Sequence, residues 1–146
     1  MDNDTTTTPA SATQATTTML TVELVRAAYA AFGAGDVDAF SRLYSADVVH
    51  ALPGNSRVSG THRGLPAVLG FYGQLAELSA GTIRVEPEAF FTDGDQRVVS
   101  VHHTTGTRNG RTLDMRESIV ITIADGKITF LDGFFDGFDA YEAFWE

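Results

Sequence analysis

Three turns of an acidic or amide residue followed by glycine constrain the fold more than any other feature of the chain. They are Asp93-Gly94, Asn109-Gly110 and Asp125-Gly126, and β-rich runs lie between them. Such dipeptides readily adopt the positive φ angles that tight hairpins require. The chain from Ile83 to the Asp136-Gly137 pair is therefore predicted to form a four-stranded antiparallel meander.

Helical patterns precede these strands. Residues 22–34 carry apolar side chains at helical spacing, and Asp36 is a plausible N-cap for a short second helix. A strand is predicted at residues 48–52, and a third helix begins near Leu65. The last residues, FDAYEAFW, favour a short C-terminal helix. Helices followed by a sheet indicate the α+β class, with the helices covering one face of a curved sheet.

The N-terminal residues differ in composition from the rest of the chain. Residues 1–19 are rich in threonine and alanine, so we expect a disordered tail, and residues 20–146 are expected to form one domain. Residues 1–19 contain neither the basic segment nor the apolar segment that is found in secretory signals. No apolar run approaches the roughly 18 residues of a membrane span. A cytoplasmic location is the resulting expectation.

Charge and cysteine content restrict the class of partner. The formal net charge is -9, which argues against nucleic acid and anionic membranes as partners, because both require a basic surface. The chain has no cysteine, so it has neither a disulfide framework nor a thiol nucleophile. No metal-ligand spacing and no glycine-rich phosphate loop occurs. We therefore expect no metal and no cofactor.

One strand pattern places an acid among apolar residues. In LDMRESIVITI, residues 113–123, alternate side chains from Leu113 are apolar except for Glu117. Alternate residues of a strand share a face, and a lone buried carboxylate is costly unless it is paired or protonated. Glu117 is therefore a candidate for a proton carrier. The alternative is a structural carboxylate that is satisfied by an arginine or a backbone amide.

The order of these segments resembles the nuclear transport factor 2-like superfamily, and within it the SnoaL-like and ketosteroid-isomerase-like proteins. The matching residues are YAAFGAGDVDAFSRLYSADVV (29–49), the Pro-Gly after the first strand, GTHRG before the third helix, and ADGKITF…FFD at the last hairpin. The resemblance implies a cone-shaped domain whose curved antiparallel sheet wraps around helices and encloses a mostly apolar pocket. It also implies a homodimer that packs through the outer face of the sheet.

Known catalytic groups of this family are replaced at the corresponding positions. Where the isomerases carry a tyrosine and two aspartates, this sequence has Ala28, Leu52 and Ile119. Where the epoxide hydrolases carry Arg, Asp and Asp, it has Ser100, His102 and Gly133. The resemblance therefore supports the fold but does not supply a ready-made site.

Three other residues are predicted to carry the chemistry. Glu117 lies two positions before Ile119 and His50 two positions before Leu52, so both share the pocket face of their strands. His102 corresponds to a catalytic carboxylate of the hydrolases, although strand alternation alone equally allows His103 to point inward.

Each of these residues also has a structural interpretation. The alternative for His50 is a hydrogen-bonded histidine at the edge of the core. Tyr72 also has two interpretations: its hydroxyl donates to a developing oxyanion, or its ring only packs in the core. The predicted substrate-binding residues are Tyr72, Met115, Leu52 and Phe135, and His62 and Arg63 are expected in a solvated loop.

These residues together suggest general acid–base catalysis. A carboxylate and an imidazole in one pocket can move a proton between two atoms of a substrate near neutral pH. We therefore expect a cofactor-free cyclase or isomerase that acts on an apolar, oxygenated, polyketide-like small molecule. The alternatives are a non-catalytic small-molecule binding protein and an epoxide hydrolase or dehydratase with a rearranged acid–base pair. Apolar residues of the last strand, Ile128, Phe130 and Phe134, suit a homodimer interface.

Overall fold

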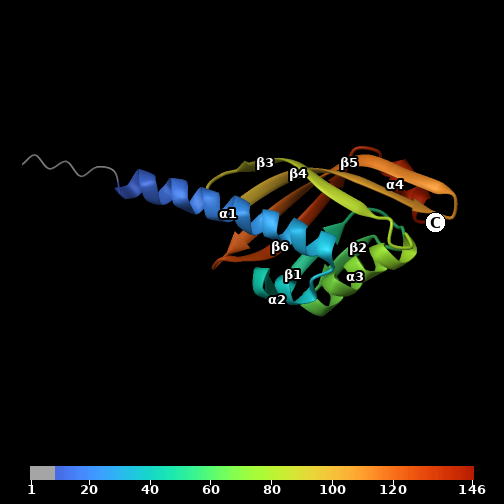
Figure 1. Ribbon diagram of the computed structural model, residues 1–146, viewed down its shortest axis with the longest axis horizontal. Helices are drawn as coiled ribbons and strands as arrows, with labels where there is room; N and C mark the ends of the chain where they lie inside the picture. The colour runs from blue at the N-terminus through green and yellow to red at the C-terminus, as the bar shows by residue number, and fades with distance from the viewer. Residues whose placement is uncertain (1–8) are drawn as a thin grey trace, which may run out of the picture.

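The computed structural model describes the backbone of residues 9–146 and the side chains from residue 20 onward. Within these residues, three helices and two strands come first, and the four strands of the meander follow (Figure 1). The elements are α1 (Pro9–Ala34), α2 (Val37–Leu43), β1 (Tyr44–Leu52), β2 (Gly60–Arg63), α3 (Leu65–Leu78), β3 (Arg84–Thr92), β4 (Arg97–Arg108), β5 (Arg111–Ala124), β6 (Lys127–Phe135) and α4 (Phe138–Phe144).

Helix α1 begins earlier than the sequence pattern indicates. It starts at Pro9, so residues 9–19 are helical where a disordered tail was expected, and they run out beyond the sheet in Figure 1. Once a helix is nucleated by packing, each further residue adds one backbone hydrogen bond, and alanine favours this extension. Residues 1–8 of the expected tail lie outside the described residues.

The strands form one curved sheet in the order β2-β1-β6-β5-β4-β3. Strands β3 to β6 are the predicted antiparallel meander, and only β1 and β6 pair in parallel, which makes the sheet mixed. The expectation of a solvated loop at His62 and Arg63 is wrong, because both residues belong to β2 and pair with β1. Four residues without an alternating apolar pattern give no strand signal in the sequence.

The helices cover the concave face of the sheet, as expected for the α+β class (Figure 1). Val25 of α1, Val68 of α3 and Val98 of β4 are fully buried in one core cluster. The same cluster contains Ile128 of β6, which was expected on the outer face. The expectation is wrong for Ile128 because the β5–β6 pairing shifts register between Thr122 and Ile123 and turns Ile128 inward.

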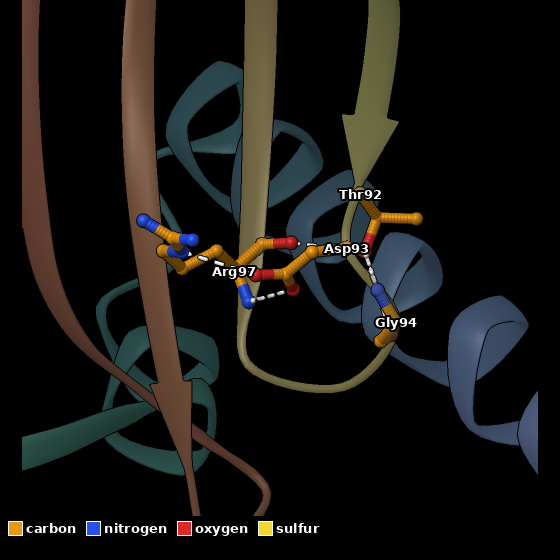
Figure 2. Close-up of polar contacts among 4 residues, drawn as sticks. All are labelled: Thr92, Asp93, Gly94 and Arg97. Carbon is orange, nitrogen blue, oxygen red and sulfur yellow. Dashed lines mark hydrogen bonds and ion pairs between the residues drawn. The ribbon is translucent and has the colours of Figure 1, made fainter.

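The turn between β3 and β4 forms as its sequence predicts (Figure 2). Gly94 has a φ of 125°, and its N–H donates to the Thr92 hydroxyl at 3.0 Å. The Asp93 carboxylate accepts hydrogen bonds from the backbone N–H and the Nε of Arg97, both at 3.0 Å. Side chains on both sides of the glycine thus fix the hairpin.

A second glycine holds the loop after β1 against the C-terminal helix. Gly54 has a φ of 103°, and the Glu142 carboxylate occupies the space that a Cβ of this residue would need. Glu142 of α4 accepts hydrogen bonds from the Asn55 N–H at 3.0 Å and the Ser59 hydroxyl at 3.3 Å. The absence of a side chain at Gly54 therefore permits this contact.

We expect Gly54→Ala to lower the free energy of unfolding more than Gly94→Ala. Both substitutions place a Cβ at a strongly positive φ, but nothing lies within 4 Å of a Cβ at Gly94. The additional loss, about 1–2 kcal/mol, corresponds to the hydrogen bonds of Glu142 that must break. Urea unfolding of the two variants measures this difference, and equal losses would contradict the proposed role of Glu142.

Candidate active site

A cavity of about 90 Å³ lies between the concave face of the sheet and helices α1 and α3. Its walls are mostly aromatic and aliphatic. Six of the seven predicted site residues line it: His50, Leu52, Tyr72, His102, Glu117 and Phe135. Five of them lie on strands, where they share the concave face, and Tyr72 reaches the cavity from α3.

His102 and Glu117 form a pair inside this cavity. They are directly opposite one another on β4 and β5, and His102 Nε2 lies 2.9 Å from Glu117 Oε2. Their side chains are only 3% and 12% exposed. The adjacent His103 lies on the other face, where it contacts Asp114. The structure thus places His102, rather than His103, in the pocket.

Tyr29 of α1 completes a chain of hydrogen bonds with this pair. Its hydroxyl lies 2.6 Å from His102 Nδ1 and 2.6 Å from the Ser100 hydroxyl. Burial raises the pKa of Tyr29 above its ordinary range, the hydrogen bond with Ser100 opposes this shift, and the charge of Glu117 adds to it. Because the phenol stays protonated, it donates to Nδ1, and the proton of His102 then sits on Nε2 facing Glu117.

Tyr29 is the residue that the sequence analysis missed. Ala28 stands at the position of the family's tyrosine, so the hydroxyl was expected to be absent. Both Ala28 and Tyr29 line the cavity, so the next residue of the helix supplies the hydroxyl. The signal was present, because adjacent residues at the centre of a helical stripe both reach the covered face.

A second hydrogen-bonded chain approaches the cavity from β1 and α3. The Tyr72 hydroxyl lies 2.9 Å from His50 Nδ1 and 2.8 Å from the Tyr44 hydroxyl. Burial raises the pKa of both tyrosines above the ordinary range. Burial, and then the charges of His62 and His102, lower the pKa of His50 to about 3. His50 is therefore neutral, and in the tautomer in which Nδ1 accepts from Tyr72 its proton is on Nε2.

Each chain ends in a buried atom without a hydrogen-bond partner among the described residues. These atoms are His50 Nε2 and Glu117 Oε1, and both residues line the cavity. Buried polar atoms are almost always hydrogen-bonded, so an unpaired donor and an unpaired acceptor in one cavity require an explanation. Polar groups of a ligand in the cavity would satisfy both.

The other candidate residues lie elsewhere. Met115 is not one of the residues that line the cavity, because its side chain packs near Gly137 at the start of α4, which covers that end of β5. His62 stacks on Phe71 with ring centroids 4.2 Å apart, so it supports the wall beside His50. Met115 thus lies away from the cavity, whereas Leu52, Tyr72 and Phe135 line it.

Comparisons with known proteins identify the family. Residues 25–131 match the model of the SnoaL-like domain. The chain belongs to the SnoaL-like family. An uncharacterised protein of Mycobacterium tuberculosis is 35% identical over 124 residues, which cover 85% of this chain and 95% of that protein.

Two solved structures of other proteins share the same architecture. Bal32a, from a soil-derived mobile gene cassette, has a TM-score of 0.86 and 28% identity, and covers 89% of this chain and 99% of its own. TerC, co-crystallised with polyporic acid, has a TM-score of 0.73 and 25% identity, and covers 84% of this chain and 96% of its own. The fold predicted from the sequence resemblance is confirmed.

In the part of the chain that the structure describes, no helix combines the length and the apolar character that a membrane span requires. In that same part, no three histidine or carboxylate side chains gather in the way that a metal ion requires.

The buried neutral state of His50 makes stability depend on pH. The unfolded chain binds a proton at His50 below about pH 6.5, whereas the folded protein does so only near pH 3. The contribution of neutral His50 to the free energy of unfolding is thus complete above pH 6.5 and is lost as the pH falls toward 3. We expect the wild type to lose roughly 2 kcal/mol between pH 6.5 and 5 that His50→Phe does not lose.

Urea unfolding of both proteins at a series of pH values measures this difference. Each protein is referred to its own value at pH 8, which removes the loss of the hydrogen bond to Tyr72. Parallel pH profiles for the two proteins would show that His50 is not held neutral by burial.

Proposed function

We propose that this protein is a cofactor-free acid–base enzyme of the cyclase or isomerase type, acting on an apolar, oxygenated small molecule. One observation carries the proposal: His50 Nε2 and Glu117 Oε1 are buried without a hydrogen-bond partner among the described residues, and both residues line one apolar cavity. One atom is a donor and the other an acceptor. A carbonyl compound with a proton on the adjacent carbon complements both.

Glu117 is the proposed general base. Its Oε2 is held by His102, so Oε1 remains available to accept a proton from the carbon next to a carbonyl group. The C–H bond then breaks, and its electron pair forms the enolate. Tyr29 fixes the His102 ring from the opposite side and so keeps the carboxylate in one orientation.

His50 is the proposed donor to the oxygen on which negative charge develops. A neutral imidazole with its proton on Nε2 can donate without adding a charge to the apolar cavity. Tyr72 and Tyr44 hold the ring from its Nδ1 side. This assignment gives Tyr72 a positioning role instead of the direct oxyanion contact considered from the sequence.

The fate of the enolate decides between the two reaction types. In an isomerisation, the proton on Glu117 returns to a different carbon and the double bond moves. In a cyclisation, the enolate carbon attacks a second carbonyl of the same molecule, and the proton on Glu117 neutralises the new alkoxide. Both reactions balance without an added oxidant, reductant or metal. The complex of the relative TerC with polyporic acid supports a small-molecule occupant.

Deuterium uptake tests the proposed base. In D₂O at neutral pD, the wild type is expected to exchange protons next to the carbonyl of a panel of small ketones, including acetone and butan-2-one. Glu117→Gln should reduce this rate at least 100-fold, because the amide retains the shape of the side chain but cannot accept the proton. Proton NMR follows the exchange.

The exposed Glu88, which pairs with Arg116, offers a matched control. Glu88→Gln should exchange at the wild-type rate. An unchanged rate in Glu117→Gln would exclude Glu117 as the base. Saturable binding of the ketones without exchange by the wild type would favour a non-catalytic binding protein instead.

A homodimer through the outer face of the sheet is part of the same proposal. Phe91, Phe130 and Phe134 are 61%, 37% and 51% exposed, and Val99 and Val120 lie on the strands between them. Exposed apolar patches of this kind are typical of interfaces. The outer sheet face of a second copy of the chain would pack against these rings and cover them.

We expect Phe134→Glu to convert the dimer into a monomer, because a carboxylate cannot be buried against the apolar partner face. Sedimentation velocity measures the change. Phe138 of α4 is also exposed, but it lies on a helix rather than on the sheet, so Phe138→Glu should leave the dimer intact. A wild type that sediments as a monomer at micromolar concentration would contradict the proposal.

A further inference from the structure

A second hollow adjoins the cavity and is larger than it. It measures about 590 Å³ and lies between the C-terminal end of α1, helix α3 and the start of β3. Four residues line both spaces: Phe32, Phe40, Tyr72 and Val85. We propose that this groove binds the apolar chain of a substrate whose carbonyl head occupies the cavity, an inference that rests on the proposed function and specifies its substrate class.

The size of the cavity is the first reason. Its volume of about 90 Å³ is smaller than the roughly 150 Å³ cavity that binds benzene. Only a small group, such as a ketone with its neighbouring carbons, fits between His50 and Glu117. The remainder of any larger substrate must leave the cavity, and the groove is the adjacent space, on the other side of the four shared residues.

The walls of the groove indicate what it binds. Leu69, Ile83 and Val85 contribute aliphatic surface, and Gly33 and Gly73 contribute no side chain. A Cβ at either glycine would meet nothing within 4 Å, so the space beside both helices is open. An unbranched alkyl or acyl chain is the group that gains most from such a surface.

Charged groups of the groove lie at its rim. Arg84 and Glu86 line it but are exposed. The Nη1 of Arg84 already donates to the carbonyls of Gly81 and Ile83. Neither residue is a buried partner for a charged ligand, which favours an uncharged chain.

A series of alkan-2-ones tests the groove. These ketones, from butan-2-one to nonan-2-one, keep one head and lengthen only the tail. In the wild type, each methylene that reaches the groove should lower Kd about threefold to fourfold. In Gly73→Leu the added side chain fills the groove, so the dependence on chain length should flatten. Isothermal titration calorimetry measures Kd.

Gly70 provides the matched control on the same helix. It does not line the groove, and a Cβ there also meets nothing within 4 Å, so Gly70→Leu should keep the wild-type dependence. Ala76→Leu, at a second groove position, replaces Gly73→Leu if that variant unfolds. A flat dependence in the wild type, or an unchanged one in the groove variants, would overturn the inference.

The two proposals fail separately. Binding of the tail involves no proton transfer, so Glu117→Gln should retain the dependence on chain length. If Kd does not depend on chain length in the wild type but deuterium exchange occurs, the groove is excluded as the binding site and the proposed base stands. If Kd depends on chain length but the wild type shows no exchange, the proposed base is excluded and the groove stands.

Discussion

The hydrogen bond between His102 and Glu117 is the interaction on which the arrangement of the cavity depends. It allows an ionisable acid to stay inside an apolar space, where an unpaired carboxylate would be costly. Its geometry follows from the β4–β5 register, which sets the two residues opposite one another. A slip of one residue would turn His103 inward and remove the pair. The long hairpin is thus both the frame of the sheet and the support of the site.

The two buried histidines differ because their surroundings differ. His102 faces a carboxylate on one side and a phenol on the other. Among the described residues His50 has a hydrogen bond with a phenol, and burial lowers its pKa to about 3. One ring therefore supports the carboxylate proposed as the base, whereas the other is the neutral ring proposed as the donor. A site that separates these roles can remove a proton and stabilise the resulting oxyanion at the same time.

Sequence reasoning succeeded where one strand decides the outcome. The period of two along residues 113–123 was sufficient to place Glu117 on the inner face, and the Asx-Gly pairs were sufficient for the meander. It failed where the outcome depends on a neighbour. His102 and His103 could not be separated without the register against β5, and a register shift beside β6 put Ile128 and Phe130 on opposite faces. Tyr29 was missed because a helical stripe is wider than one residue.

The unpaired atoms of His50 and Glu117 distinguish this cavity from an ordinary gap in the core. A gap lined by apolar groups costs only lost contacts, whereas a buried donor or acceptor without a partner also loses its hydration. Stability alone would favour apolar residues at both positions. The chain instead supports each group from behind, through Tyr29 and Ser100 on one side and Tyr44 and Tyr72 on the other. Such support keeps the two atoms oriented, as the proposed binding of a polar ligand in the cavity requires.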